Sequence, residues 1–373
     1  MYISKHHYAI QLSLQGNMVY YMNGPDQKEE LNRGEIKIEK SKFQHLHVLK
    51  HRFSFPYFIM FKCRPLFNYL VGLHIKKIIK IINPSNELII WSFDLSNTIP
   101  LKYFPSTALK IFMPVDEPLV NKALQAAQTA NYIFSVTQDI INKYTKYNLP
   151  SLNINHGVSD IFFSNSIRVT ANSPIQVGLS GNFLRPDIDW PTLLSIISQH
   201  QNIVFNFWGS TTIKTKEAKG VIDYSLGGQT NNEQAVKNIE TLSNLPNVIL
   251  HGSLVHSELS AALKKVDIFL ICYDINKDQS KGTNYHKIME YLASGKVIVS
   301  NNVKAYQGLN NLLVMTESRI DNKELPDIFF KTVANIDLLN NLENQQLRIQ
   351  YASKHTYAMQ IKRIEEFINA NGS

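Results

Sequence analysis

The chain of 373 residues holds 38 Lys and Arg against 30 Asp and Glu, a formal charge of +8. Its 44% apolar and 18% charged residues indicate a globular protein and exclude a disordered one. At roughly 100 to 200 residues per domain, the length predicts two domains. Two cysteines cannot build a disulfide framework or a zinc cluster, and the sequence lacks the apolar stretch of a membrane span or a secretion signal. We therefore expect a cytoplasmic protein.

The N-terminal half opens with a helical pattern over residues 4–16, in which Gly16 has the place of a C-terminal cap. A strand pattern follows at 18–22. In a doubly wound sheet the first strand is normally central, yet no strand pattern precedes this helix. Two interpretations stay open: the domain is built in an unusual way, or its first strand is missing because the natural start lies upstream. We expect the second.

Short apolar runs typical of strands alternate with longer helical patterns along the rest of the chain, which indicates α/β layering. Strands are predicted at 18–22, 35–39, 46–49, 88–93, 110–113, 132–136, 151–155, 175–181, 203–209, 247–252, 267–273, 296–300 and 311–315. Helices are predicted at 66–82, 117–130, 137–147, 189–199, 232–243, 256–265, 284–294 and 323–335.

This alternation predicts two doubly wound, Rossmann-like domains. The first covers residues 1–165 and the second covers 174–340, with the polar stretch between them as the linker. Residues 341–373 are helical and amphipathic, and we expect them to pack back on the first domain.

The excess positive charge lies in the first 150 residues, which hold 18 basic and 10 acidic residues, whereas the remainder holds 20 of each. Much of it falls in residues 45–83, where Lys and Arg alternate with aromatic and aliphatic residues. As a helix, residues 66–82 of this segment place Phe67 and Ile75 on one side and Lys76 roughly opposite. Two interpretations stay open: a core helix with a solvated cationic face, or a helix attracted to an anionic membrane surface at about 1 kcal/mol per basic residue. No nucleic-acid-binding motif accompanies the segment, so nucleic acid is not an expected partner.

Residues 267–300 carry the strongest local signal. A buried strand pattern ends near Tyr273, a polar loop with Gly282 follows, and a helix is predicted from Asn284. In a parallel sheet this loop lies at the carboxyl edge, where ligands bind. We expect the backbone N–H groups of Thr283 and Asn284 to receive a phosphate there.

Lys287 and Glu290 are three residues apart and share a face of this predicted helix. A cation near the helix start suits a diphosphate, and a carboxylate one turn deeper can accept hydrogen bonds from the two hydroxyls of a ribose. The alternative is a plain surface ion pair worth a few tenths of a kcal/mol.

The run KIMEYLASGKVIV, preceded by LPNVILHGSLVHSELSAALKKVDIFLICY, resembles the nucleotide-sugar-binding half of a GT-B glycosyltransferase, close to family 4. ANYIFSVTQDIINKY, INHGVSDIFF and IQVGLSGNF resemble further blocks of that family, in the same order over roughly residues 110–310. The resemblance implies two Rossmann-like domains that face a central cleft, a nucleoside-diphosphate sugar as donor, and retention of the anomeric configuration. It implies no metal and no other cofactor.

The resemblance also implies roles for single residues. Glu290 corresponds to the ribose-binding glutamate of the family, and Lys287 lies in its helix facing the donor. Gly181 and Asn182 occupy the turn near the donor phosphates, and Arg185 is the nearby cation that can stand for the phosphate-binding arginine of the family.

Gly252 falls where family members hold the base through backbone groups. The sequence also departs from the family pattern. Many members have two glutamates separated by seven residues, whereas the position eight before Glu290 is Gly282. Thr283 and Asn284 can offer hydrogen bonds to a sugar there, but no charge. The missing glutamate implies either that the protein binds its sugar through a different pattern of contacts or that it has lost catalysis.

In the N-terminal half we take Asp116 and His7 as the candidate catalytic residues. Asp116 follows the strand at 110–113, at the edge where an acceptor is expected, and His7 lies in the first helix. The alternative for Asp116 is to cap the helix that begins beyond Pro118, and the alternative for His7 is a surface role.

These features predict a glycosyltransferase, peripheral at the inner face of the membrane, that moves a sugar from a nucleoside-diphosphate sugar to a glycan or lipid-linked acceptor in surface polysaccharide synthesis. A catalytically idle GT-B protein that binds a nucleotide sugar is the first alternative. A sugar-nucleotide 2-epimerase on the same fold is the second.

Overall fold

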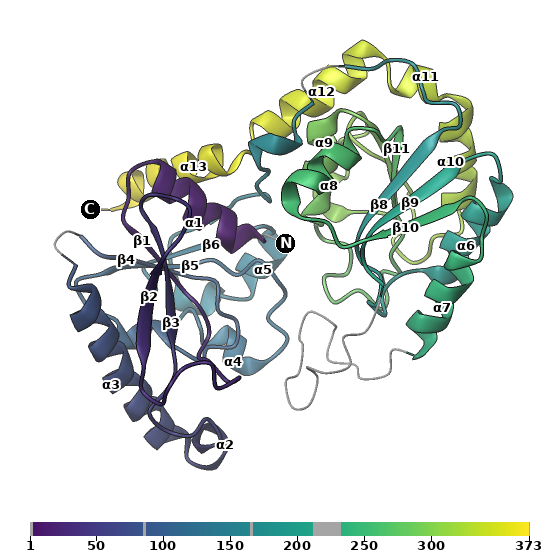
Figure 1. Ribbon diagram of the computed structural model, residues 1–373. Coiled ribbons are helices and arrows are strands. Elements are labelled where there is room, and N and C mark those ends of the chain that lie inside the picture. The colour runs from purple at the N-terminus through teal and green to yellow at the C-terminus, as the bar shows by residue number, and fades with distance from the viewer. Residues whose placement is uncertain (1–2, 85–86, 165–166, 212–232, 373) are drawn as a thin grey trace. The chain divides into compact units, whose positions relative to one another are not determined.

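The computed structural model describes residues 3–84, 87–164, 167–211 and 233–372. The chain forms two compact units (Figure 1). The C-terminal unit contains residues 156–356, and the N-terminal unit contains the described residues up to Asn155 together with those from Tyr357 onward. Residue 165, where the first domain was expected to end, and residue 232, where a helix was expected to begin, lie outside the described residues.

The C-terminal unit is a doubly wound domain with one sheet of six parallel strands. Its strands are β8 (Gln176–Asn182), β9 (Val204–Ser210), β10 (Val248–Gly252), β11 (Ile268–Ile271), β12 (Val297–Ser300) and β13 (Val314–Met315). Their order is β10-β9-β8-β11-β12-β13, so that the first strand of the unit is central and the winding reverses between β8 and β11. Ligands bind at such a switch point, beyond the carboxyl ends of the strands.

Helices cover both faces of this sheet. They are α6 (Trp190–Gln199), α7 (Glu233–Ser243), α8 (His256–Leu263), α9 (Lys287–Ser294), α10 (Leu325–Ala334), α11 (Ile336–Leu339) and α12 (Leu342–Ser353). Figure 1 shows α6 and α10 on one face and α8 and α9 on the other. The central strands β11 and β12 are buried at every residue, which explains their unbroken apolar runs in the sequence.

The N-terminal unit contains two sheets. The first is a parallel sheet of β4 (Ile89–Ser92), β5 (Leu109–Phe112), β6 (Tyr132–Ser135) and β7 (Ser151–Asn153), in that order. The second comprises β1 (Val19–Met22), β3 (Leu46–His51) and β2 (Ile36–Lys40), with β2 antiparallel to β3. This hairpin departs from the predicted parallel layering, because the few residues that join its strands are too short for a crossover.

The helices of the N-terminal unit are α1 (Ser4–Leu14), α2 (Ile59–Lys62), α3 (Arg64–Ile82), α4 (Asn121–Leu124), α5 (Gln138–Asn142) and α13 (Tyr357–Asn371). α4 and α5 are much shorter than the helices predicted at 117–130 and 137–147. After α4 the chain continues in isolated turns, and Thr129 adopts a positive φ of 70°, which ends any helix.

Two helices far apart in the sequence share one core of this unit. Tyr8 of α1 and Ile361 and Ile364 of α13 are buried together with Phe134 of β6. α1 and α13 therefore lie on the same side of the unit (Figure 1).

One face of α3 is buried as the sequence predicts. Phe67, Val71 and Ile75 are each 0% exposed and pack with Leu49 and Phe53. The core interpretation is therefore correct for this face. Across the described parts of the chain, α3 included, no helix combines the length and the apolarity that crossing a membrane requires.

Candidate functional site

The candidate site lies at the switch point of the C-terminal unit, where β8 and β11 end side by side. Gly181 and Asn182 close β8, Tyr273 follows β11, and α9 begins at Lys287. The helix thus begins three residues later than predicted. The N–H of Thr283 donates to the carbonyl of Ser280 at 3.1 Å, so the prediction that this N–H is free for a phosphate is wrong.

The ammonium group of Lys287 is held by two hydrogen bonds at the base of the candidate site. Nζ donates to the carbonyl oxygen of Ser180 and to the hydroxyl oxygen of Tyr273, the latter at 2.6 Å. The residue is only 8% exposed, and burial lowers the pKa of the ammonium. No carboxylate lies within ion-pair distance of Lys287 in the described residues, so the surface ion pair with Glu290 is not formed.

Gly181 makes room for this ammonium. A Cβ atom on Gly181 would lie 2.8 Å from Nζ of Lys287, and its φ of +148° is one that residues with side chains rarely adopt. The backbone of Gly209 at the end of β9 also comes so close that a Cβ there would lie 1.6 Å from the carbonyl oxygen of Gly181. Glycine is therefore required where the chain turns above Lys287.

Glu290 has an unsatisfied acceptor. Its atom Oε2 is out of contact with solvent and has no hydrogen-bond partner within the described residues, although the residue as a whole is partly exposed. Burial raises the pKa of this carboxyl to about 8, and the positive charge of Lys287 opposes the rise only in part. Because a buried oxygen without a donor is costly, a ligand that supplies hydroxyl donors would relieve it.

Arg185 lies close to Lys287. Its guanidinium is 5.7 Å from the ring centroid of Tyr273, and Nζ of Lys287 is 5.0 Å from the same centroid. Asp187 accepts hydrogen bonds from Nε and Nη2 and thereby raises the pKa of Arg185, while Nη1 has no partner in the described parts of the chain. The structure thus brings together the two cations that the sequence indicated.

The loop before α9 is organised by a carboxylate that the sequence analysis missed. Asp278 is 3% exposed and accepts hydrogen bonds from the N–H of Gly282 at 2.9 Å and the hydroxyl of Tyr285 at 2.8 Å. Its side chain also accepts from Ser280, an Asx turn that the Asp-x-Ser spacing could have indicated. Tyr273, the partner of Lys287, was missed as well.

Gly282 stands at the position where the resemblance to GT-B glycosyltransferases implies a glutamate. The structure explains why this position holds a glycine. Its φ is +63°, and a Cβ atom there would lie 2.9 Å from the carbonyl oxygen of Asn302. Thr283 and Asn284 beside it are buried, with 8% and 7% exposure. A carboxylate side chain at position 282 would therefore require the backbone to move.

Two further residues that were predicted to bind the nucleotide sugar, Asn182 and Gly252, lie at the same edge of the sheet. Oδ1 of Asn182 accepts a hydrogen bond from the N–H of Leu184 and so stabilises the turn after β8. Gly252 ends β10, two strands away from β8, and its φ is +69° with open space where a Cβ would be. Gly252 is partly exposed, and its base-binding role stays a prediction.

The two candidate catalytic residues belong to the N-terminal unit. The ring of His7 stacks on Tyr357 with centroids 4.7 Å apart. Asp116 is exposed after β5 and does not cap α4, whose N-cap residue is Val120. Their catalytic roles stay predictions. Among the residues that the structure describes, no three His, Cys, Asp or Glu side chains gather as a metal site would need.

Solved structures resemble the fold over most of the chain. Sucrose-phosphate synthase from Thermosynechococcus elongatus matches with a TM-score of 0.66 at 12% identity, over 98% of this chain and 92% of that protein. Trehalose-6-phosphate synthase OtsA matches with a TM-score of 0.66 at 10% identity, over 98% and 95%. Anabaena HepE in complex with UDP matches with a TM-score of 0.58 at 12% identity, over 80% and 82%. The chain has the GT-B fold.

The GT-B fold confirms the predicted fold class, and with it the resemblance to GT-B proteins. No protein-family model and no curated protein matches the sequence. Membership of family 4 stays a prediction.

Proposed function

We propose that this GT-B protein is a glycosyltransferase whose C-terminal unit binds a nucleoside-diphosphate sugar. The observation that carries the proposal is the buried, unpartnered carboxylate oxygen of Glu290, one helical turn from the buried ammonium of Lys287. These are the two groups that a ribose diol and a diphosphate need. The acceptor is a glycan or lipid-linked molecule, transfer retains the anomeric configuration, and the enzyme acts in the cytoplasm in surface polysaccharide synthesis.

The proposed mechanism uses fixed charge where charge develops. As the bond between the anomeric carbon of the sugar and the diphosphate oxygen of the donor breaks, negative charge grows on the leaving nucleoside diphosphate. Lys287 and Arg185 stabilise it from positions set before the reaction, so that no reorganisation is needed. His7 and Asp116 are proposed for the acceptor side. No metal is needed in this mechanism, since the side chains supply the positive charge.

Donor binding is the first test. A thermal-shift screen against UDP-, GDP-, ADP- and CMP-sugars identifies the base, because a ligand at 100 times its dissociation constant adds about 2.7 kcal/mol of stability. Glu290→Ala should then weaken binding of that donor at least tenfold. Glu258→Ala on the exposed side of α8 is the matched control and should bind as the wild type does. Unchanged affinity of Glu290→Ala would overturn the ribose assignment.

Turnover is the second test. With the donor identified, NMR of the product reports the anomeric configuration, which should match that of the donor. An inverted product would contradict retention but leave the transferase activity in place.

A catalytically idle nucleotide-sugar-binding protein is the second candidate. Position 282 favours it, because the backbone around Gly282 has no space for the carboxylate side chain that many family members have there. Donor binding without any transfer or donor hydrolysis would support this candidate. Slow hydrolysis of the donor would exclude it.

We further propose that the outer side of α2 and α3 contacts an anionic membrane. Phe61 and Tyr69 are 77% and 64% exposed, and Leu73 is 45% exposed on the same side of α3. Lys76 and Lys80 continue this side toward the end of the helix, both exposed. Apolar rings that can enter the headgroup region next to lysines that attract anionic lipid are typical of interfacial helices.

A further inference from the structure

A cavity of about 670 Å³ lies at the amino-terminal edge of the sheet in the C-terminal unit. Gln176 at the start of β8, Lys265 shortly before β11 and Lys296 directly before β12 line it. The candidate donor site is at the other end of the same strands. Since the seven residues of β8 span roughly 20 Å, the cavity is separate from that site.

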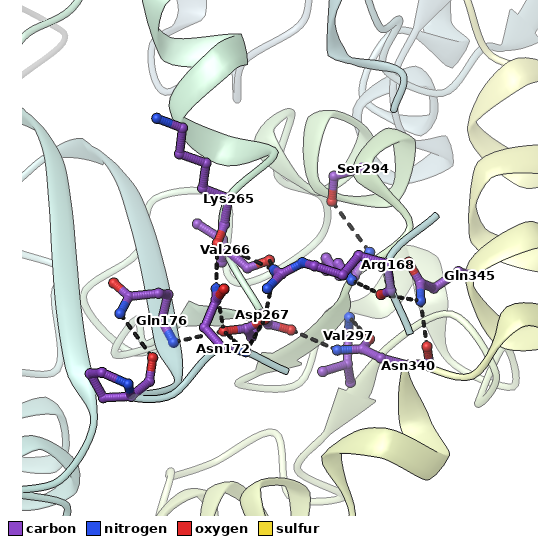
Figure 2. A network of polar contacts seen from close by, with 12 residues as sticks. Arg168, Asn172, Gln176, Lys265, Val266, Asp267, Ser294, Val297, Asn340 and Gln345 are labelled. Atoms are coloured by element: carbon purple, nitrogen blue, oxygen red, sulfur yellow. Dashed lines mark hydrogen bonds and ion pairs between the residues drawn. The ribbon is translucent and has the colours of Figure 1, made fainter. Parts of the chain in front are cut away.

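Three residues that line the cavity, Arg168, Asn172 and Gln176, bind one buried carboxylate behind it (Figure 2). Asp267 is 0% exposed and accepts hydrogen bonds from Nη2 of Arg168 at 2.7 Å, Nδ2 of Asn172 at 2.9 Å and the N–H of Gln176 at 2.8 Å. This network ties the segment before β8 to the start of β11. The negative charge of Asp267 is thereby paired with the positive charge of Arg168.

Three lysines at this cavity have no such compensation. Lys264, Lys265 and Lys296 line it, and none has a carboxylate within ion-pair distance in the described part of the chain. Figure 2 shows the side chain of Lys265 leading away from the network around Asp267. Four basic residues therefore line the cavity, and the network supplies one carboxylate for them.

Lys296 is the most buried of these cations. It is 4% exposed, and Nζ donates to the carbonyl oxygen of Arg168, which carries no full charge. Burial, together with the positive charge of Arg168, lowers the pKa of this ammonium to about 8, and the negative charge of Asp267 opposes this only in part. A buried cation beside further cations is unfavourable unless an anion joins them.

The guanidinium group of Arg168 still has N–H groups available within the described residues. All hydrogen bonds of its guanidinium group are donated by Nη2, to Asp267 and to the carbonyl oxygens of Lys265 and Val266. Nη1 and Nε have no partner among the described residues, so each keeps an N–H group that can donate to an oxyanion. The remaining wall has neutral amide and hydroxyl groups, from Asn172 and Ser173.

We propose that this cavity binds a small phosphorylated carbohydrate. Its phosphate lies among Arg168, Lys265 and Lys296, and its hydroxyl-rich body lies against the neutral polar wall. The volume suits such a ligand, since small-molecule sites measure about 300 to 1,000 Å³, more than a bare phosphate ion fills. This site is independent of the proposed donor site and of any transferase activity.

Isothermal titration of the full chain with 6-phosphogluconate tests the proposal, because this probe combines a phosphate with a hydroxylated chain. The wild type should bind it, and Lys264→Ala/Lys265→Ala should weaken binding at least tenfold. Lys331→Ala, which removes an exposed lysine from α10 of the same unit, is the matched control and should bind normally. Excess UDP should not displace the probe. Equal melting temperatures would show that the double variant is folded.

Three results would overturn the proposal. The first is no binding of millimolar probe to the wild type. The second is unchanged binding to the double variant, which would place the probe elsewhere. The third is binding of inorganic phosphate as tight as that of the probe, which would show that the cavity recognises an oxyanion and not a carbohydrate.

Discussion

Glu290 links donor binding to pH. Its pKa is raised to about 8, so below that pH the free protein holds the carboxyl mainly in its protonated form, whereas the ionised form accepts hydrogen bonds from both hydroxyls of a diol. Binding then releases a proton. We expect the affinity for the nucleotide sugar to rise by up to about tenfold per pH unit from pH 6 to pH 8 and to level off above that.

Isothermal titration across this pH range measures the slope, and a sugar nucleotide is the right ligand because it has no terminal phosphate that titrates there. Glu290→Gln cannot ionise, so its affinity should not change with pH. Equal slopes for the variant and the wild type would show that another group is responsible.

Gly181 and Gly252 both end strands, but they need to be glycine for different reasons. At Gly252 the reason is the backbone conformation alone, whereas at Gly181 a Cβ atom would also lack space. Both have positive φ, but only at Gly181 would a Cβ come within 2.8 Å of the Lys287 ammonium. Gly181→Ala should therefore destabilise the protein by about 1 to 3 kcal/mol and also weaken donor binding. Gly252→Ala should cost about 1 kcal/mol, since it meets open space. Urea unfolding and donor titration of both variants make the comparison, and equal donor affinities would contradict it.

Helix α3 has a buried face and an exposed face, and we propose a different task for each. Tyr69→Ser/Leu73→Ser changes only exposed side chains, so it should leave the melting temperature nearly unchanged and reduce binding to phosphatidylglycerol vesicles. Phe67→Ala on the buried face should cost about 3 to 5 kcal/mol of stability. Vesicle co-sedimentation and thermal melts separate the two effects.

Leu338→Ser, which removes a 65% exposed leucine from the other unit, is the matched control for the vesicle experiment. Its binding should equal that of the wild type. Equal losses in both variants, or equal binding to phosphatidylcholine, would contradict a docking face on α3.

Elements with a strong local signal were predictable from the sequence. The apolar runs of β8 to β12 and the alternating faces of α3 reflect burial that each residue experiences directly, so period and composition report it. The start of α9 was not predictable, because Asp278 and its hydrogen bonds hold the preceding loop in a non-helical form. The antiparallel hairpin of β2 and β3 follows from the short connection between them, because a parallel pair needs a longer crossover.

The two candidate sites also differ in how far the sequence could predict them. Lys287 and Glu290 are three residues apart on one helix, so the spacing placed them on one face, and the resemblance to GT-B glycosyltransferases then indicated a donor site. The cavity with Arg168, Lys265 and Lys296 was not predictable, because Asn172, which lines it, is held by Asp267, 95 residues away in the chain. No local pattern records such a contact.

At the scale of the whole molecule, the N-terminal unit depends on residues from the far end of the chain. Tyr357, Ile361 and Ile364 of α13 are buried in the core that contains Tyr8 and Phe134. Ending the chain after Thr356 should therefore destabilise the N-terminal unit by several kcal/mol while the C-terminal unit still binds donor.

Hydrogen exchange followed by mass spectrometry checks this expectation unit by unit. Protection should fall in β5 and β6 and persist in β8 to β12. Loss of protection throughout the chain would show instead that the two units unfold together.

The return of α13 also has a consequence for synthesis on the ribosome. The backbone of Val158 donates to His355 at 3.0 Å and Gln360 donates to Asn155 at 2.7 Å, so the chain leaves the N-terminal unit and re-enters it at neighbouring points. The N-terminal unit is made before the C-terminal unit but cannot close its core until α13 emerges. The later-made unit is thus the first that can be completed, and the nascent chain exposes an apolar surface around Tyr8 and Phe134 while the C-terminal unit is made.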